Sequence, residues 1–315
     1  VIFNCKKKVD LLYINKKRAA GLKNNSLKAF SELAQSIYSV LETYSNVHRG
    51  SGHKSMATTY LYERARDIVL EYTGLEKSKY VVIFCSPARA EALSSQLRND
   101  SYQLLSSVNT GLPLGIRALI VRKKSLSRGI PLQAGGGTAK LVAPGWVVWA
   151  KTPEKFEAGT PAIINAIAFA RALQLTMHYG KDVFRDLDPD NLSADDILYH
   201  DDLEQYTGKK LLDELYSKII GRGLPVPTLE GIKTYVNLDN AASTPSFVPV
   251  WNTFCQALKQ PGQILNEIIK KVKAECLKIL NAPPSDYEVI FTSNTTESIN
   301  LVAESLRQES WSDSD

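Results

Sequence analysis

The spacing of apolar residues predicts helices in the first part of the chain and a buried strand after the second of them. Residues 24–45 carry an apolar stripe at helical spacing and begin with Asn and Ser, which are residue types that cap helices. A second helix is predicted from about Thr58 to Thr73. The continuous apolar run Tyr80–Phe84 is typical of a buried strand, and residues 207–220 predict a further helix.

The pattern changes from strand-like to helical within residues 289–301. The first residues are apolar and β-prone, and apolar positions at helical spacing follow a cluster of Thr and Ser. Asn294 and Glu297 have the spacing of a capping box, which predicts a helix start at this cluster. A strand that leads into a helix N-terminus directs free N–H groups and the positive end of the helix dipole to one point. The stretch therefore predicts a cradle for phosphate or another small anion, although an ordinary Ser/Thr cap that binds nothing has the same pattern.

Length and composition bound the class of protein. A chain of 315 residues is long enough for about two domains, and apolar and charged fractions of 44% and 23% are ordinary for a globular protein. No apolar run approaches the roughly 18 residues that a membrane span needs, and the N-terminus lacks the order of a secretory signal. The first residue is not Met, so we expect a fragment. The four cysteines have no metal-binding spacing, which favours reduced thiols in a cytoplasmic protein.

The net charge of +5 is modest, and much of it lies in the first thirty residues. Nucleic acid or another polyanion is one interpretation of these lysines, and a solvated helix face or subunit rim is the other. Aromatic interleaving is absent, which favours the solvated face over nucleic-acid binding.

Two motifs resemble class V aminotransferases and cysteine desulfurases, which use pyridoxal phosphate. Residues 291–301 resemble the phosphate cup of these enzymes, and residues 236–245 resemble their Leu-Asp-Asn-Ala-Ala opening. The resemblance implies an α/β fold, an incomplete large domain of fold type I with helices packed on a mixed sheet. It also implies that the cofactor contacts include Ser293, Thr295, Thr296, Asp239 and Asn240.

The first part of the chain resembles the same family. Residues 46–50 resemble an Asn-x-His-Arg-Gly loop, in which His48 and Arg49 are candidate cofactor contacts and a role in loop structure is the alternative. Residues 133–138 resemble a glycine-rich loop through which a neighbouring subunit reaches the cofactor phosphate, and a flexible surface turn is the alternative. The candidate contacts there are Gly136, Gly137 and Thr138. Residues 156–173 match the family's Phe-Glu-Ala-Gly-Thr-Pro motif and the apolar helix that follows it.

The lysine that would hold the cofactor is missing from its expected place. Residues 104–121 resemble the segment around the family's Schiff-base lysine, and counting back from Pro113 and Gly115 puts that position on Asn109. An amide cannot hold the cofactor covalently. Lys54 lies in a Ser-x-His-Lys sequence, but a His-Arg-Gly loop precedes it and a helix follows, so we expect a loop lysine. The absence of Cys from residues 100–254 argues against desulfurase activity.

These observations predict an abridged internal repeat. Residues 1–220 would form a degenerate class V unit, residues 221–234 a linker, and residues 235–315 the start of a second unit. One hypothesis is a partial or catalytically impaired section of a longer tandem enzyme that acts on a small amino acid or amine. The alternative is a non-catalytic pseudo-aminotransferase that serves as a dimerisation or partner-binding scaffold. We expect a cytoplasmic homodimer or a longer tandem chain, with no membrane and no nucleic-acid partner.

Overall fold

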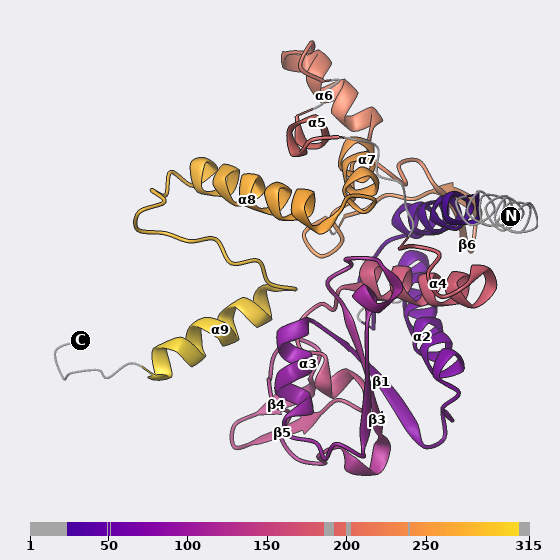
Figure 1. Ribbon diagram of the computed structural model, residues 1–315, viewed down its shortest axis with the longest axis vertical. Coiled ribbons are helices and arrows are strands. Elements are labelled where there is room, and N and C mark those ends of the chain that lie inside the picture. The colour runs from indigo at the N-terminus through magenta and orange to yellow at the C-terminus, as the bar shows by residue number, and fades with distance from the viewer. Residues whose placement is uncertain are drawn as a thin grey trace, which may run out of the picture.

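The computed structural model describes residues 24–48, 50, 52–185, 192–199, 203–238 and 240–308. Arg49 and Asp239, two of the predicted cofactor contacts, lie outside these residues. The described part of the chain contains three small sheets, and helices pack around the largest of them (Figure 1). This arrangement confirms the predicted α/β class.

The largest sheet has three strands in the order β1-β3-β2, with β3 antiparallel to both neighbours. The resemblance implied a mixed sheet, whereas every strand pair in the described residues is antiparallel. The predicted strand at residues 80–84 is confirmed. The bounds of the three strands are β1 Tyr80–Cys85, β2 Tyr102–Ser106 and β3 Arg117–Arg122.

Both faces of this sheet are covered along β1 and β3, which explains why these two strands are apolar without alternation, whereas Gln103 and Leu104 of β2 are exposed. Val82 and Ile120 belong to the main core, together with the helix of residues 24–42 and with α2 and α4. Ile83 and Leu119 face the other side and pack with α3 in a smaller core. Because side chains alternate across a strand, one apolar run supplies both cores. The helices are α2 His53–Thr73, α3 Pro87–Ser94 and α4 Ile163–Tyr179.

The remaining elements are short or project from this body (Figure 1). A hairpin of β4 (Ala139–Ala143) and β5 (Trp146–Trp149) follows the central sheet, and the η segments are single 3-10 turns. Residues 221–234 were expected to be a linker, and they contain the hairpin of β6 (Pro225–Thr228) and β7 (Gly231–Thr234). The other elements are η1 Ser107–Thr110, η2 Lys123–Ser125, η3 Glu154–Phe156, α5 Ala194–Leu198, α6 Gly208–Ser217, α7 Val248–Ala257, α8 Gly262–Ile279 and α9 Thr295–Gln308.

The segment after residue 235 contacts the first part of the chain in several places, which include an ion pair between Lys271 of α8 and Asp195 of α5 at 2.8 Å. Trp251 and Phe254 of α7 pack against the main core. The N-terminus of α9 docks beside α3, at the end of a long irregular segment that follows α8 (Figure 1). The strand predicted at residues 289–291 does not form, and Ile290 and Phe291 are exposed. A strand is stabilised by hydrogen bonds to a neighbouring strand, and no described strand pairs with these residues. Among the described helices, none has the length and apolar composition of a membrane span.

A buried ion pair joins α2 to the sheet and to the loop before α4. Glu157 accepts hydrogen bonds from both Arg66 terminal nitrogens, at 2.8 and 2.7 Å, from the Tyr62 hydroxyl at 3.0 Å and from the Phe84 N–H at 2.8 Å. The Arg66 Nη1 also donates to the Val82 carbonyl at 2.6 Å. The Arg66 and Glu157 side chains are each 5% exposed. Four donors on one carboxylate, two of them cationic, compensate the desolvation of the pair.

We expect Glu157→Leu to destabilise the protein by about 3–5 kcal/mol, because it leaves the Arg66 guanidinium buried without its counter-ion. The double variant Arg66→Met/Glu157→Leu should recover much of this loss, because neither charge remains. Urea unfolding followed by circular dichroism measures both. Arg64→Met is the control, because Arg64 pairs with Glu71 at the surface and such pairs contribute about 1 kcal/mol or less. A Glu157→Leu loss no larger than that of the control would contradict the expectation.

Candidate functional site

Three segments far apart in the sequence meet at the candidate site. They are residues 86–89 at the start of α3, residues 157–162 before α4, and residues 292–297, which include the start of α9. Two adjoining cavities lie between them, with volumes of about 20 and about 710 Å³. The larger cavity has a mostly apolar wall, which includes Tyr44, Leu114, Ile163, Ile164 and Phe291. Residues that line both cavities include Ser86, Ser293, Asn294 and Glu297.

Asn294 fixes α9 to the first part of the chain. Its Nδ2 donates to the carbonyls of Ala158 at 3.3 Å and Thr160 at 2.9 Å, and its Oδ1 accepts the Glu297 N–H at 2.9 Å. A Cβ atom added at Gly159 would overlap the Asn294 amide, and Gly159 has a φ of +82°. Glycine has no Cβ and readily adopts a positive φ, and both properties allow this loop to contact Asn294 at the start of α9.

The predicted helix start at the hydroxyl cluster is confirmed. Asn294 caps the helix through the Glu297 N–H, and the Glu297 carboxylate accepts the Ser293 N–H at 2.8 Å. This is the reciprocal arrangement of a capping box, displaced by one residue on the carboxylate side. The positive end of the helix dipole therefore lies at the two cavities.

The three predicted phosphate contacts on this segment have different surroundings. Ser293 lines both cavities, and Thr295 is exposed at the first turn of α9. Thr296 packs against the glycine-rich loop so closely that a Cβ at Gly135 would overlap its methyl group. The structure thus brings the hydroxyl cluster and the glycine-rich loop together, although more than 150 residues separate them in the sequence.

The glycine-rich loop is a defined turn. Thr138 is fully buried, and its hydroxyl accepts the Gly135 N–H at 3.0 Å and donates to the Gly135 carbonyl at 2.7 Å. The Gly136 carbonyl accepts the Gly159 N–H at 2.8 Å, and Gly137 has a φ of +89°. The Thr138 hydroxyl is therefore used inside the turn, while Gly136 and Gly137 are exposed.

Glu297 connects the first turns of α9 and α3. The Ser86 hydroxyl donates to Glu297 Oε1 at 2.6 Å and accepts the Arg89 N–H at 3.3 Å as the cap of α3. Burial alone would raise the pKa of the Glu297 carboxyl, but the hydrogen bonds from Ser86 and Ser293 lower it. Cys85 lines the smaller cavity, and burial raises the pKa of its thiol to about 12, so it is not a reactive thiolate at neutral pH.

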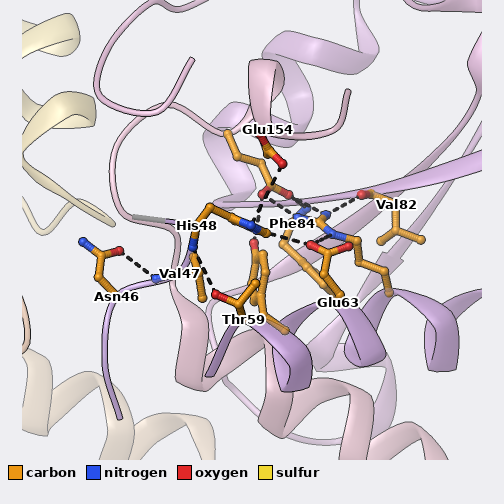
Figure 2. Close-up of polar contacts among 11 residues, drawn as sticks. Asn46, Val47, His48, Thr59, Glu63, Val82, Phe84 and Glu154 are labelled. Atoms are coloured by element: carbon orange, nitrogen blue, oxygen red, sulfur yellow. Dashed lines mark hydrogen bonds and ion pairs between the residues drawn. The ribbon is translucent and has the colours of Figure 1, made fainter. Parts of the chain in front are cut away.

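His48 lies in a polar cluster beside the buried ion pair (Figure 2), because its partner Glu63 also accepts a hydrogen bond from Arg66 at 3.1 Å. Its Nε2 is 3.3 Å from Glu63 and its Nδ1 is 4.0 Å from Glu154, and its backbone N–H donates to the Thr59 hydroxyl at 3.1 Å. The hydrogen bond to Glu63 raises the pKa of His48. Partial burial opposes ionisation of Glu63, but hydrogen bonds from His48 and Arg66 lower its pKa to about 2. His48 lines neither cavity and orders the loop at the start of α2.

Three other sequence candidates also lie away from the cavities. Lys54 is buried at the start of α2 with its Nζ 4.3 Å from the Tyr235 ring centroid, and burial lowers its pKa. Asn240 is in an exposed turn, where its side chain accepts a hydrogen bond from Asn237 at 2.8 Å. Asn109 is exposed in η1, and its carbonyl accepts a hydrogen bond from Arg185 at 3.0 Å.

Residue patterns did not identify two important roles. Asn294 was interpreted as a cap, and its second role in docking depends on a loop 134 residues away. Glu157 was noted only as part of a family motif. Its position among apolar residues in the sequence was the signal that it could be buried with an internal partner.

We expect Gly159→Ala to detach the N-terminus of α9, because the new methyl group would overlap Asn294. Amide hydrogen exchange of residues 292–308 should become at least tenfold faster. Gly145→Ala is the matched control, because Gly145 has a φ of +84° but open space around its Cβ position. Both variants carry the same backbone strain of about 1 kcal/mol. Equal exchange of residues 292–308 in the two variants would contradict the docking role of Gly159.

We expect the His48–Glu63 pair to give a pH-dependent stability. The His48 contribution is present below its ordinary pKa of 6.5 and is lost as the pH rises through its raised folded pKa. The Glu63 contribution is present above 4.5 and is lost as the pH falls towards about 2. His48→Gln should reduce the loss of unfolding free energy on the alkaline side by less than about 1 kcal/mol, because the pair is partly exposed. Thermal unfolding at a series of pH values measures this change. The control is His178→Gln, which removes an exposed His; an unchanged profile in His48→Gln would refute the pairing.

Comparisons with known proteins agree with the motifs. The family model described as Aminotransferase class-V matches residues 106–190 and 236–315. A probable cysteine desulfurase of Aeropyrum pernix is 28% identical over 208 residues, which cover 62% of this chain and 44% of the relative. A probable cysteine desulfurase of Staphylococcus aureus is 33% identical over 90 residues, 29% of this chain and 22% of the relative. The chain thus spans less than half the length of these curated relatives.

A solved structure gives a weaker likeness. The apo cysteine desulfurase of Thermococcus onnurineus is 17% identical with a TM-score of 0.40, over 50% of this chain and 68% of that chain. The two segments that match the family model together make up more than half of the chain. The chain therefore belongs to the aminotransferase class-V family, whose members depend on pyridoxal phosphate.

Proposed function

We propose that this chain is part of a class V aminotransferase-like enzyme and that it supplies a phosphate-holding surface without the covalent anchor. The observation that carries the proposal is the meeting of the α9 N-terminus with the glycine-rich loop at Gly135 and Thr296. Each element alone is a weak signal, but a loop with free N–H groups beside a helix N-terminus is a suitable environment for an anion.

The residues present fit one end of pyridoxal phosphate. The first-turn N–H groups of α9 and the Ser293 and Thr295 hydroxyls can donate to a phosphate, and Gly136 and Gly137 leave the approach open. Within the part of the chain that the structure describes, the aldehyde end has no partner, because no lysine there lines either cavity and the residue at the lysine position, Asn109, is exposed elsewhere. When bound, pyridoxal phosphate supplies an electron sink for chemistry at the amino-bearing carbon. The role of these residues is to bind and orient its phosphate.

This incomplete donor set supports a partial or catalytically impaired unit. In a longer tandem chain or a homodimer, a lysine from another segment or subunit would complete the site for a small amino acid or amine substrate. A cytoplasmic location accords with this chemistry and belongs to the proposal.

A specific observation favours the second candidate, a non-catalytic dimerisation or partner-binding scaffold. The hairpin of β4 and β5 exposes apolar side chains on neighbouring positions, with Val142 70% exposed and Trp146 53% exposed. Contiguous apolar surface of this kind is typical of an interaction site.

We expect pyridoxal phosphate to bind the purified chain without a covalent link and in competition with inorganic phosphate. Borohydride reduction should leave no pyridoxyl group on any lysine in a mass-spectrometric peptide map. Thr295→Val and Ser293→Ala should weaken binding by about threefold to tenfold, because each removes a hydroxyl that can donate to the phosphate.

A pyridoxyl-lysine would overturn the impaired-unit proposal. Lys54→Ala is the control that decides whether that lysine is Lys54. Absence of any binding, together with self-association in sedimentation experiments, would favour the scaffold instead.

A further inference from the structure

Arg89 is buried with an incomplete set of partners. Its relative exposure is 7%, and its Nη1 donates to the Ala158 carbonyl at 3.1 Å, while its Nε has no hydrogen-bond partner. Among the described residues no carboxylate lies within ion-pair distance of Arg89. The nearby Glu157 carboxylate already accepts from Arg66, Tyr62 and the Phe84 N–H. A buried guanidinium without a counter-ion is energetically costly, and such groups occur where a ligand supplies the missing charge.

This guanidinium lines the smaller cavity, which shares its wall with the larger one. Ser86, Ser293 and Glu297 border both cavities, so a ligand group beside Arg89 could continue into the larger space. The wall of that space is apolar at Leu114 and Ile163 and aromatic at Tyr44 and Phe291. A charged recess that opens into an apolar chamber matches a molecule with one charged end and a hydrocarbon body.

The chain already places one carboxylate at this recess. Glu297 arrives from a segment 211 residues away and accepts the Ser86 hydroxyl at 2.6 Å, at the N-terminus of α3. Its carboxylate is close enough to Arg89 to interact electrostatically but forms no ion pair with it. The Arg89 Nε therefore remains unpaired even with Glu297 in place. The Glu297 carboxylate shows that the recess accepts a carboxylate. The unpaired Arg89 Nε shows that Glu297 does not satisfy every donor in the recess.

The charges around the recess favour a single negative charge over two. Glu157 and Glu297 both border the smaller cavity and are opposed by Arg89 there. A dianionic phosphate that displaces Glu297 would add one negative charge beside Glu157, whereas a carboxylate that displaces Glu297 keeps the number of charges unchanged.

We propose that Ser86, Arg89 and the N-terminus of α3 bind the carboxylate of a small aromatic or aliphatic monocarboxylate, and that Glu297 competes for this place. The hydrocarbon part of the ligand occupies the larger cavity. Binding displaces Glu297 and thereby loosens the N-terminus of α9. This site adjoins the phosphate surface proposed above but uses α3 rather than Thr295 and Thr296.

The probe is 3-phenylpropionate, measured by isothermal titration calorimetry on the full chain. Its uncharged analogue 3-phenylpropanamide has the same shape and should bind at least tenfold more weakly, because a hydrogen bond to a charged group is stronger than one to a neutral group. Equal binding of acid and amide would overturn the proposal.

The variants act in opposite directions. Arg89→Gln should weaken 3-phenylpropionate binding at least tenfold, and Glu297→Gln should strengthen it, because the internal competitor loses its charge. Ser86→Ala is the second variant if Arg89→Gln does not fold, and it should also weaken binding. Binding that is unchanged in both Arg89→Gln and Ser86→Ala, or weakened in Glu297→Gln, contradicts the proposal.

Two further readouts separate this site from the phosphate surface. Thr295→Val should leave 3-phenylpropionate binding unchanged while it weakens pyridoxal phosphate binding, so either proposal can fail alone. Saturating 3-phenylpropionate should accelerate amide exchange of residues 293–298, which a ligand elsewhere would not do. Unchanged exchange would show that Glu297 is not displaced and would overturn the competition.

Discussion

The carboxylate of Glu157 is the point at which the fold and the candidate site meet. It holds α2 through Arg66 and Tyr62 and holds β1 through the Phe84 N–H. The same residue begins the loop that presents the Ala158 and Thr160 carbonyls to Asn294. Because a buried carboxylate with four donors has little freedom to move, the loop is fixed in place by the core and not by its own short turn.

The rest of the site depends on close contacts between α9 and two glycine positions, one of them in this fixed loop. Gly159 admits Asn294, and Gly135 admits Thr296, in each case because no Cβ is present. The helix α9 thus docks through its first two turns, where Asn300 also donates to the Ala134 carbonyl, and its own apolar stripe remains exposed. The contact is small, specific and polar, which distinguishes it from the apolar packing of α7 on the main core.

Local sequence patterns predicted helices and strands better than they predicted which segments these elements contact. The apolar run at residues 80–84 gave a strand because it is buried on both faces, and the Asn294 and Glu297 spacing gave a helix start because capping is a local interaction. The strand predicted from a similar apolar run at residues 289–291 was wrong. A strand also needs a neighbouring strand to pair with, and the local sequence does not show whether one is present. The glycine-rich loop was recognised as a possible phosphate contact, but its use of the Thr138 hydroxyl inside the turn depends on three-dimensional geometry. The incomplete pairing of Arg89 could not be predicted, since it depends on the positions of three distant segments.

The way α9 is attached has a consequence for assembly. Its docked first turn lies at the end of an irregular segment that follows α8, so the helix is held by few contacts and a long tether. Such a piece opens with far less free energy than the whole protein. A detached α9 would fit against the same surface, at Gly135 and Gly159, of a second copy of the chain. Concentration alone could then convert this intramolecular contact into a reciprocal exchange of helices between two molecules.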